Sequence, residues 1–255
     1  MHASSVSGHG SSIKNYPYLG PEEFTEACHH LDSQYCRATL GPVRKQWRLR
    51  AVMALNTSPF SMLGLEYHTY IQIIRPLEDS SSGREDDDLS RYLDKFSFGG
   101  DAEDKEMAEA EEADTESLHP TAEPAKYNPG YVRYEIHLHP TYQVPCLWFS
   151  LHDLPLDEPA FNVDTVFRRL VPDQFKDGLR SAVGSIGGIS ADHHPITGLP
   201  SFFIHPCLLG DAMSNFECSR ETYLMVWLGL VGGCVGLWVP KEMALDSPTG
   251  RGASE

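Results

Sequence analysis

The sequence predicts an α+β fold, an antiparallel β-meander flanked by helices. The first indication is that helical and strand patterns are grouped along the chain and do not alternate as in a parallel α/β sheet. The second is a β-hairpin, in which the strand patterns Tyr131–His139 and Val144–Leu151 are separated only by the turn Pro140–Gln143. The length of 255 residues suits one such domain with additional segments.

The first element expected is an amphipathic helix over Pro21–Thr39. Its apolar residues recur at the spacing of one helical face, at Phe24, Ala27, Cys28, Leu31 and Tyr35. A proline is tolerated in the first helical turn, and Glu22 and Glu23 suit the positive end of the helix dipole. Gly41 and Pro42 then end the helix.

Two strands are expected next, over Gln46–Leu55 and Gly64–Ile74, with a turn at Asn56–Ser61. The second has the stronger pattern, because alternate positions from Leu65 to Ile73 are mostly apolar. In the later hairpin, both faces of the strand Val144–Leu151 are largely apolar, which favours a central strand covered by helices.

An acidic insertion separates the strand pair from the hairpin. Residues 78–126 hold 17 acidic and 5 basic residues, so most of the net charge of −16 lies there. With few apolar residues, segment 76–126 is expected to be disordered, except that an island from Leu89 to Phe98 is either residual helix or a partner-docking motif. The remaining body is nearly neutral and has no extended basic patch, which argues against nucleic-acid binding.

The two ends of the chain are expected to be disordered, over residues 1–20 and 243–255. The Ser/Gly/His-rich start has no apolar core and is not a signal peptide. Without a secretory signal, the six cysteines are expected to be free thiols, most of them buried. Residues 21–75 and 127–242 are then expected to form one domain.

The second half of the chain predicts further helices. Asn162–Leu170 has helical spacing with Asn162 or Asp164 as the cap, and a helix resumes over Asp173–Val183 after Pro172. The glycine-rich residues 184–188 are expected to form a loop and residues 189–200 to be irregular, before a short strand at Phe202–Ile204.

The uncharged run Tyr223–Val239 allows two interpretations. Its 17 residues lie at the short limit of a membrane-spanning helix. The alternative is a buried helix over Glu221–Val231, a break at Gly232-Gly233, and a core strand over Cys234–Val239.

The candidate chemistry lies in His205-Pro206-Cys207. Pro206 disfavours a helix, and in an extended segment His205 and Cys207 would project to the same side. An imidazole beside a thiol favours the thiolate or polarises a carbonyl.

Two other uses of these residues remain open. A metal site could draw on His193, His194, His205, Cys207 and Cys218, although their spacing matches no structural zinc motif. A thiol hydrolase would pair Cys207 with a histidine and a carboxylate, for which His194 and Asp192 are nearest in sequence.

Three ordered segments then resemble one family, the autophagy E2-like conjugating enzymes. The segment 189–207, ISADHHPITGLPSFFIHPC, is similar to that family's active-site region. The segments TYQVPCLWF (141–149) and YLMVWLGLVGGCVGLWVP (223–240) are similar to its hairpin and C-terminal segments in the same order. The resemblance implies a ubiquitin-conjugating-enzyme-like fold, and it favours the core helix and strand over the membrane span. The pattern departs in having Gly232-Gly233 for Gly-Pro and apolar Leu208 and Leu209 where a lysine is frequent.

The resemblance also implies an activity. Cys207 would accept the ubiquitin-like modifier autophagy-related protein 12 as a thioester from the activating enzyme, autophagy-related protein 7. A lysine of autophagy-related protein 5 would then attack, with no cofactor or metal, and the product is an isopeptide bond. His205 would orient that lysine or stabilise the oxyanion, and Tyr142 would help to place the lysine.

The same family resemblance implies a cytoplasmic transferase of autophagosome formation and protein transport, recruited to forming autophagosomal membranes. The alternative is a protein without enzymatic activity, a catalytically silent scaffold with the same fold. It would use its sheet edge and the acidic insertion to bind partners.

Overall fold

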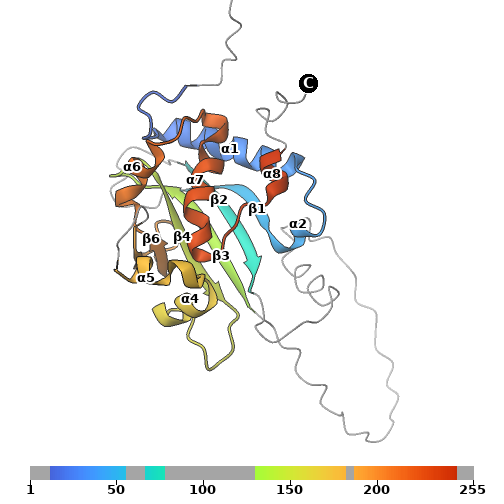
Figure 1. Cartoon of the computed structure of the whole chain (residues 1–255), viewed down its shortest axis with the longest axis vertical. Coiled ribbons are helices and arrows are strands. Elements are labelled where there is room, and N and C mark those ends of the chain that lie inside the picture. Colours follow the sequence, from blue (N-terminus) through green and yellow to red (C-terminus); the bar gives the residue numbers. More distant parts are fainter. Residues whose placement is uncertain (1–11, 56–66, 78–129, 182–186, 246–255) are drawn as a thin grey trace, which may run out of the picture.

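The computed structural model describes residues 12–55, 67–77, 130–181 and 187–245. Within these ranges, six strands form one sheet in the order β1-β2-β3-β4-β6-β5, and every neighbouring pair is antiparallel (Figure 1). The strands are β1 (Arg48–Leu55), β2 (Tyr67–Pro76), β3 (Tyr131–Leu138), β4 (Pro145–His152), β5 (Ile189–His193) and β6 (Pro200–Ile204). The first four follow chain order, so the predicted α+β class with an antiparallel meander is confirmed.

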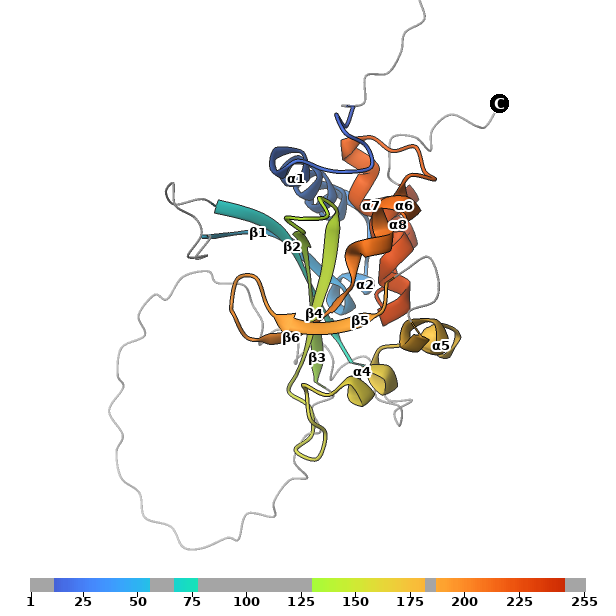
Figure 2. The same cartoon turned by 90° about the vertical axis from the view of Figure 1, so that its left-hand side faces the viewer.

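Two long helices cover one face of this sheet, α1 (Pro21–Arg37) and α7 (Arg220–Val231) (Figures 1 and 2). The five residues predicted for the apolar face of the first helix are all buried there. The remaining helices are α2 (Val43–Gln46), α4 (Val163–Arg169), α5 (Asp173–Ser181), η1 (Pro206–Leu208), α6 (Leu209–Met213), η2 (Gly232–Val235) and α8 (Lys241–Leu245). Among the described residues, no helix has the length and apolar character needed to cross a membrane.

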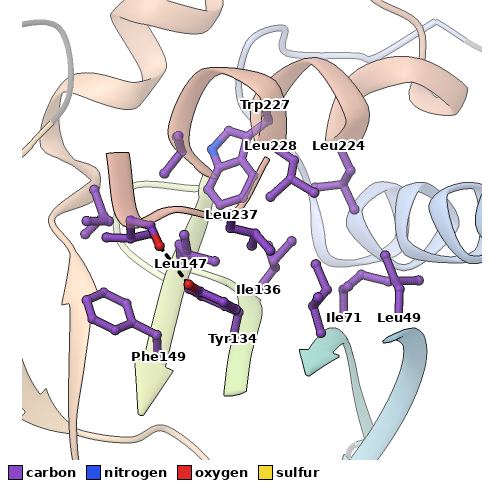
Figure 3. Packing of buried hydrophobic residues seen from close by; sticks show 14 of the residues in the cluster. Leu49, Ile71, Tyr134, Ile136, Leu147, Phe149, Leu224, Trp227, Leu228 and Leu237 are labelled. Atoms are coloured by element: carbon purple, nitrogen blue, oxygen red, sulfur yellow. Dashed lines mark hydrogen bonds between the residues drawn. The ribbon is translucent and has the colours of Figure 1, made fainter. Parts of the chain in front are cut away.

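The core lies between α7 and the sheet. Figure 3 shows Trp227 and Leu228 of α7 facing Ile136 and Leu147 of the central strands, and all four are fully buried. The buried Tyr134 hydroxyl donates a hydrogen bond of 2.7 Å to the Val235 carbonyl, which ties β3 to the chain that follows α7. Burying so much apolar surface between two layers is the main stabilising contribution to such a domain.

Of the two predicted caps of α4, Asn162 and Asp164, the structure shows Asn162, whose side chain accepts hydrogen bonds from the backbone N–H groups of Asp164 and Thr165. The expectation that residues 189–200 are irregular is wrong. Residues 189–193 form β5, which pairs with β6 from Ile189 opposite Ile204 to His193 opposite Pro200. Because β5 is an edge strand that is half-buried to exposed, it carries no apolar alternation that would reveal it.

The expected core strand at Cys234–Val239 is also wrong. The chain forms η2 instead, and Gly236 adopts a left-handed backbone with φ +71°. The Leu237 N–H then donates to the Gly232 carbonyl at 2.9 Å, and an added side chain on Gly232 would meet the Leu237 carbonyl oxygen. A compact turn therefore replaces the predicted strand. The apolar residues of this turn are buried although they pair with no strand.

The predicted domain limits need correction at both ends. Ile13 and Leu19 are buried in the core, so residues 12–20 are not disordered. At the other end, α8 extends to Leu245 and Met243 is fully buried. Pro76 and Leu77, which belong to the predicted disordered insertion, are buried as well. The expected turn at Asn56–Ser61, the rest of the acidic insertion with its apolar island, and residues 1–11 and 246–255 lie outside the described residues.

Candidate active site

Cys207 is placed on the surface by the segment that follows β6. It is the middle residue of the 3₁₀ helix η1, and its side chain is exposed. The expectation of an extended His205–Cys207 segment is therefore wrong. His205 caps η1 and Pro206 occupies its first position, where the lack of an N–H group costs nothing.

The imidazole of His205 is oriented by this cap. Its Nδ1 accepts a hydrogen bond of 3.3 Å from the backbone N–H of Cys207. A nitrogen that accepts carries no proton, so in the neutral ring Nε2 carries it and is a donor. His205 and Cys207 thus form one local unit, as predicted, but through a cap and not through strand geometry.

The backbone of His205 is held by the start of β5. Its N–H donates to the Gly188 carbonyl at 3.0 Å. Gly187 approaches even more closely, since a Cβ built on it would lie 2.0 Å from the His205 carbonyl oxygen. Only glycine fits at that position. The residues just before β5 therefore hold the backbone of His205 in place beside the sheet.

Strand order brings Tyr142 to the same end of the sheet. Cys146, near the start of β4, donates from Sγ to the Ile204 carbonyl at the end of β6, over 3.4 Å. The β3–β4 turn and the Cys207 segment are therefore adjacent. The rings of Tyr142 and His205 pack edge to face with centroids 5.8 Å apart, and Tyr142 remains 37% exposed.

The N-terminal segment braces both sides of this site, which the sequence analysis missed. The Leu19 N–H donates to the Gln143 carbonyl in the Tyr142 turn at 2.8 Å. The Tyr18 ring lies against Gly210, shortly after Cys207, so that a Cβ there would be 3.0 Å from its Cε1 atom. Residues 12–20 have no helical or strand periodicity that would predict order, because their burial depends on contacts with distant segments.

Exposure separates Cys207 from most other cysteines. Burial raises the pKa of the thiols of Cys28, Cys146 and Cys234, which makes them poor nucleophiles. Cys218 is half-buried and lies 3.2 Å from the Tyr16 hydroxyl. The other exposed cysteine, Cys36, lies near the end of α1.

The residues proposed for a thiol hydrolase or a five-ligand metal site do not meet. His193 pairs with Pro200 at the start of β6, whereas His205 follows the end of β6, about five residues or ~17 Å along the strand. Asp192 contacts its neighbour His193 on the exposed surface. His194 turns toward the sheet, where its Nε2 lies 2.6 Å from Glu135 Oε2.

Glu135, His137 and His194 form the one metal-capable cluster among the described residues, and all three are buried. Burial alone would raise the pKa of Glu135, but hydrogen bonds from His137, His194 and Gln72 overcome it and hold that pKa well below the usual range. His194 Nδ1 accepts from the N–H groups of Ile196 and Thr197, both at 3.3 Å, so its Nε2 carries the proton toward Glu135. A protonated Nε2 cannot ligate a metal, and we assign the cluster a structural role.

A cavity of about 180 Å³ lies beside this cluster, under the turn between β5 and β6. Its walls include Trp148, Phe161, Leu199 and Phe202, and none of Tyr142, His205 and Cys207 lines it. Because Cys207 is exposed and Tyr142 is partly exposed, the candidate reaction centre lies on the surface of the molecule. Such a surface suits a protein substrate better than a small molecule.

Comparison with known proteins identifies a family and two relatives. A family model described as "Autophagocytosis associated protein, active-site domain" matches residues 23–242. The chain is 63% identical over 243 residues to the ubiquitin-like-conjugating enzyme ATG10 of Gibberella zeae, which covers 92% of this chain and all of that relative. It is 30% identical over 121 residues to the human ubiquitin-like-conjugating enzyme ATG10, which covers 44% of this chain and 53% of the human protein.

Proposed function

The chain belongs to the autophagocytosis-associated family of ubiquitin-like-conjugating enzymes, and from this premise we propose that Cys207 carries the modifier as a thioester. The observation that carries the proposal is that the Cys207 thiol is exposed at the end of the sheet, in the short 3₁₀ turn that the His205 side chain caps. An exposed thiol is needed because the modifier arrives and leaves on other proteins.

The proposed reaction has two steps. The Cys207 thiolate attacks the thioester between the modifier and the activating enzyme, a bond forms from Cys207 Sγ to the modifier's terminal carbonyl carbon, and the activating enzyme's thiolate leaves. A lysine amine of the acceptor then attacks that carbon, loses a proton to solvent, and expels the Cys207 thiolate, so that an isopeptide bond remains. Neither step needs an oxidant or a metal.

His205 is proposed as a hydrogen-bond donor in both steps. Its Nδ1 is occupied by the Cys207 N–H, so the free Nε2–H points away from the cap and is available to a developing oxyanion. Tyr142, which packs on His205, is proposed to help place the attacking lysine.

The partners proposed are autophagy-related protein 7 as activating enzyme, autophagy-related protein 12 as modifier and autophagy-related protein 5 as acceptor. The names of the two relatives support ubiquitin-like conjugation in general, and the family resemblance of the three sequence segments supports this particular set. We propose that the reaction takes place in the cytoplasm at forming autophagosomal membranes.

The proposal is tested by mixing the chain with the activating enzyme, the modifier and ATP and running a non-reducing gel. The wild type should show a shifted band that a thiol reagent removes, Cys207→Ser should give a thiol-resistant oxyester, and Cys207→Ala should give no band. Cys36→Ala is the matched control, because Cys36 is exposed but lies on α1, and it should behave as the wild type. If Cys207→Ala still forms the thiol-sensitive band, the proposal is wrong, and a wild type that forms none would favour a silent scaffold.

A further inference from the structure

Three histidines in this fold share one local structure. His139, His194 and His205 each precede a proline, and each accepts at Nδ1 a hydrogen bond from the backbone N–H two residues later. The three distances are 3.2, 3.3 and 3.3 Å. Asparagine and aspartate make the same kind of turn with their side-chain oxygens, so the imidazole is used here as a backbone acceptor.

His139 has a second contact that places it behind the candidate active site. Its Nδ1 also accepts from the Tyr142 N–H at 3.3 Å, and its ring packs edge to face on the Tyr142 ring with centroids 4.8 Å apart. Tyr142 in turn packs on His205. The three rings therefore form a continuous row that ends beside Cys207.

Burial, followed by the nearby His205, lowers the pKa of His139. Near neutral pH the His139 ring is therefore uncharged, and its Nδ1 lone pair stays available to the two backbone N–H groups. Protonation of Nδ1 would turn this acceptor into a donor and would remove both hydrogen bonds.

We propose that His139 is a positioning residue that holds Tyr142 against His205 during transfer from Cys207. The inference rests on the proposed function of Cys207 and adds a residue that does not touch the reacting atoms. His139 acts indirectly, because it orients the backbone and the ring of Tyr142. The modifier can reach Cys207 without the His139 side chain.

The backbone of the turn is closed without the His139 side chain, which separates positioning from folding. The His139 N–H donates to the Val144 carbonyl at 3.0 Å, and the Gln143 N–H donates to the His139 carbonyl at 2.9 Å. Leu19 braces the turn from outside. Loss of the imidazole therefore leaves these bonds in place and frees only the amides of Thr141 and Tyr142.

Four variants separate the two contributions of the ring. His139→Asn keeps a side-chain acceptor for the turn, His139→Phe keeps an aromatic ring without an acceptor, and His139→Ala keeps neither. His29→Asn, on an exposed position of α1, is the matched control for the same substitution elsewhere. Thermal unfolding of all four should stay close to the wild type.

The measurement is single-turnover discharge. The chain is charged with modifier, ATP is removed, the acceptor protein is added, and thioester loss and amide formation are followed together. His139→Ala and His139→Phe should slow discharge by about fivefold or more, the rate equivalent of about 1 kcal/mol for a lost hydrogen bond. His139→Asn and His29→Asn should stay within about twofold of wild type, and charging should be within about twofold for every variant.

Two results would overturn the inference: equal discharge for all His139 variants, or His139→Asn as slow as His139→Ala. A wild type that never charges contradicts the proposed function but leaves the positioning residue open to a second measurement. Long-range proton–nitrogen NMR on the folded chain should then show His139 with an unprotonated Nδ1 and a protonated Nε2, and the Tyr142 amide resonance should shift in His139→Ala but little in His139→Asn. A protonated Nδ1 would refute the turn on which the inference depends.

Discussion

The ring of Tyr142 packs edge to face on the imidazole of His205, with centroids 5.8 Å apart. The two residues come from separate turns, one between β3 and β4 and the other after β6. They meet because β4 and β6 are neighbours in the sheet, with Trp148 opposite Phe203 and Phe149 opposite Phe202. The candidate site is therefore a product of strand order, and changes to either turn should affect it.

Tyr142 offers a first prediction, because its ring and its hydroxyl have separable roles. Tyr142→Phe keeps the packing on His205 and removes the group proposed to place the lysine, so discharge should slow by about fivefold. Tyr142→Ala also removes the packing and should slow discharge further, while charging on Cys207 changes little in either variant. The measurement is the two-step charging and discharge assay, and equal discharge by wild type and both variants would reduce Tyr142 to surface packing.

Gly187 offers a second prediction. The Cβ of Gly187→Ala would overlap the His205 carbonyl oxygen, and because this is a backbone atom it cannot move aside as the end of a flexible side chain could. Overpacking of this kind costs about 1–3 kcal/mol or more, and it should displace His205. We expect a lower unfolding temperature together with slower charging.

Gly229→Ala is the matched control for Gly187→Ala. Gly229 lies inside α7 with nothing within 4 Å of an added Cβ. An alanine there should raise stability by up to about 1 kcal/mol through helix propensity, with unchanged charging. A Gly187→Ala chain that melts and charges like the wild type would show that the β5 segment does not hold His205 in place.

The predicted elements that the structure confirms are those with a strong local pattern. The face from Phe24 to Tyr35 on α1 and the hairpin around Tyr142 are specified by side chains close in sequence. Cys207 and His205 likewise lie two residues apart and are chemically distinctive, so their pairing could be predicted although its geometry could not. The cap depends on the backbone turn at Pro206, which residue types alone do not show.

The elements that were missed depend on distant partners. Tyr223 donates from its hydroxyl to the Pro17 carbonyl at 2.6 Å, and Leu19 contacts Gln143, so the N-terminal segment is ordered by residues far along the chain. β5 is an edge strand with little buried side-chain surface, and only its pairing with β6 defines it. The prediction of a strand after Gly233 is wrong because an apolar run has the same composition in a strand and in a buried turn.

Glu158 offers a third prediction, which links loop structure to pH. Glu158 is 9% exposed, and its carboxylate accepts hydrogen bonds from Arg169, with Nε to Oε1 at 2.9 Å, and from Arg168. The bonds from Arg169, and then those from Arg168, lower the pKa of Glu158 to about 2. These ion pairs of Glu158 thus connect the loop after β4 to α4, next to the cavity wall at Phe161.

The sign of the effect follows from this lowered pKa. A carboxylate with a depressed folded pKa contributes stability that is fully present above its unfolded pKa of about 4.5 and is lost as pH falls toward about 2. Glu158→Gln should therefore destabilise the chain by about 1–3 kcal/mol near pH 7, a range reduced from the full linkage value because Arg168 is solvent-exposed. Urea unfolding at neutral and acidic pH measures the difference between variant and wild type.

The difference should shrink below about pH 4.5, because protonation of the unfolded carboxylate then removes the advantage of the ionised folded form. Asp157→Asn is the matched control, since it removes one charge from the exposed neighbouring position, and it should show neither the loss at neutral pH nor the pH dependence. A Glu158→Gln effect that stays constant between neutral and acidic pH would assign its cost to packing and not to the ion pair. Because the loop lies away from Cys207, charging by folded Glu158→Gln should equal that of the wild type.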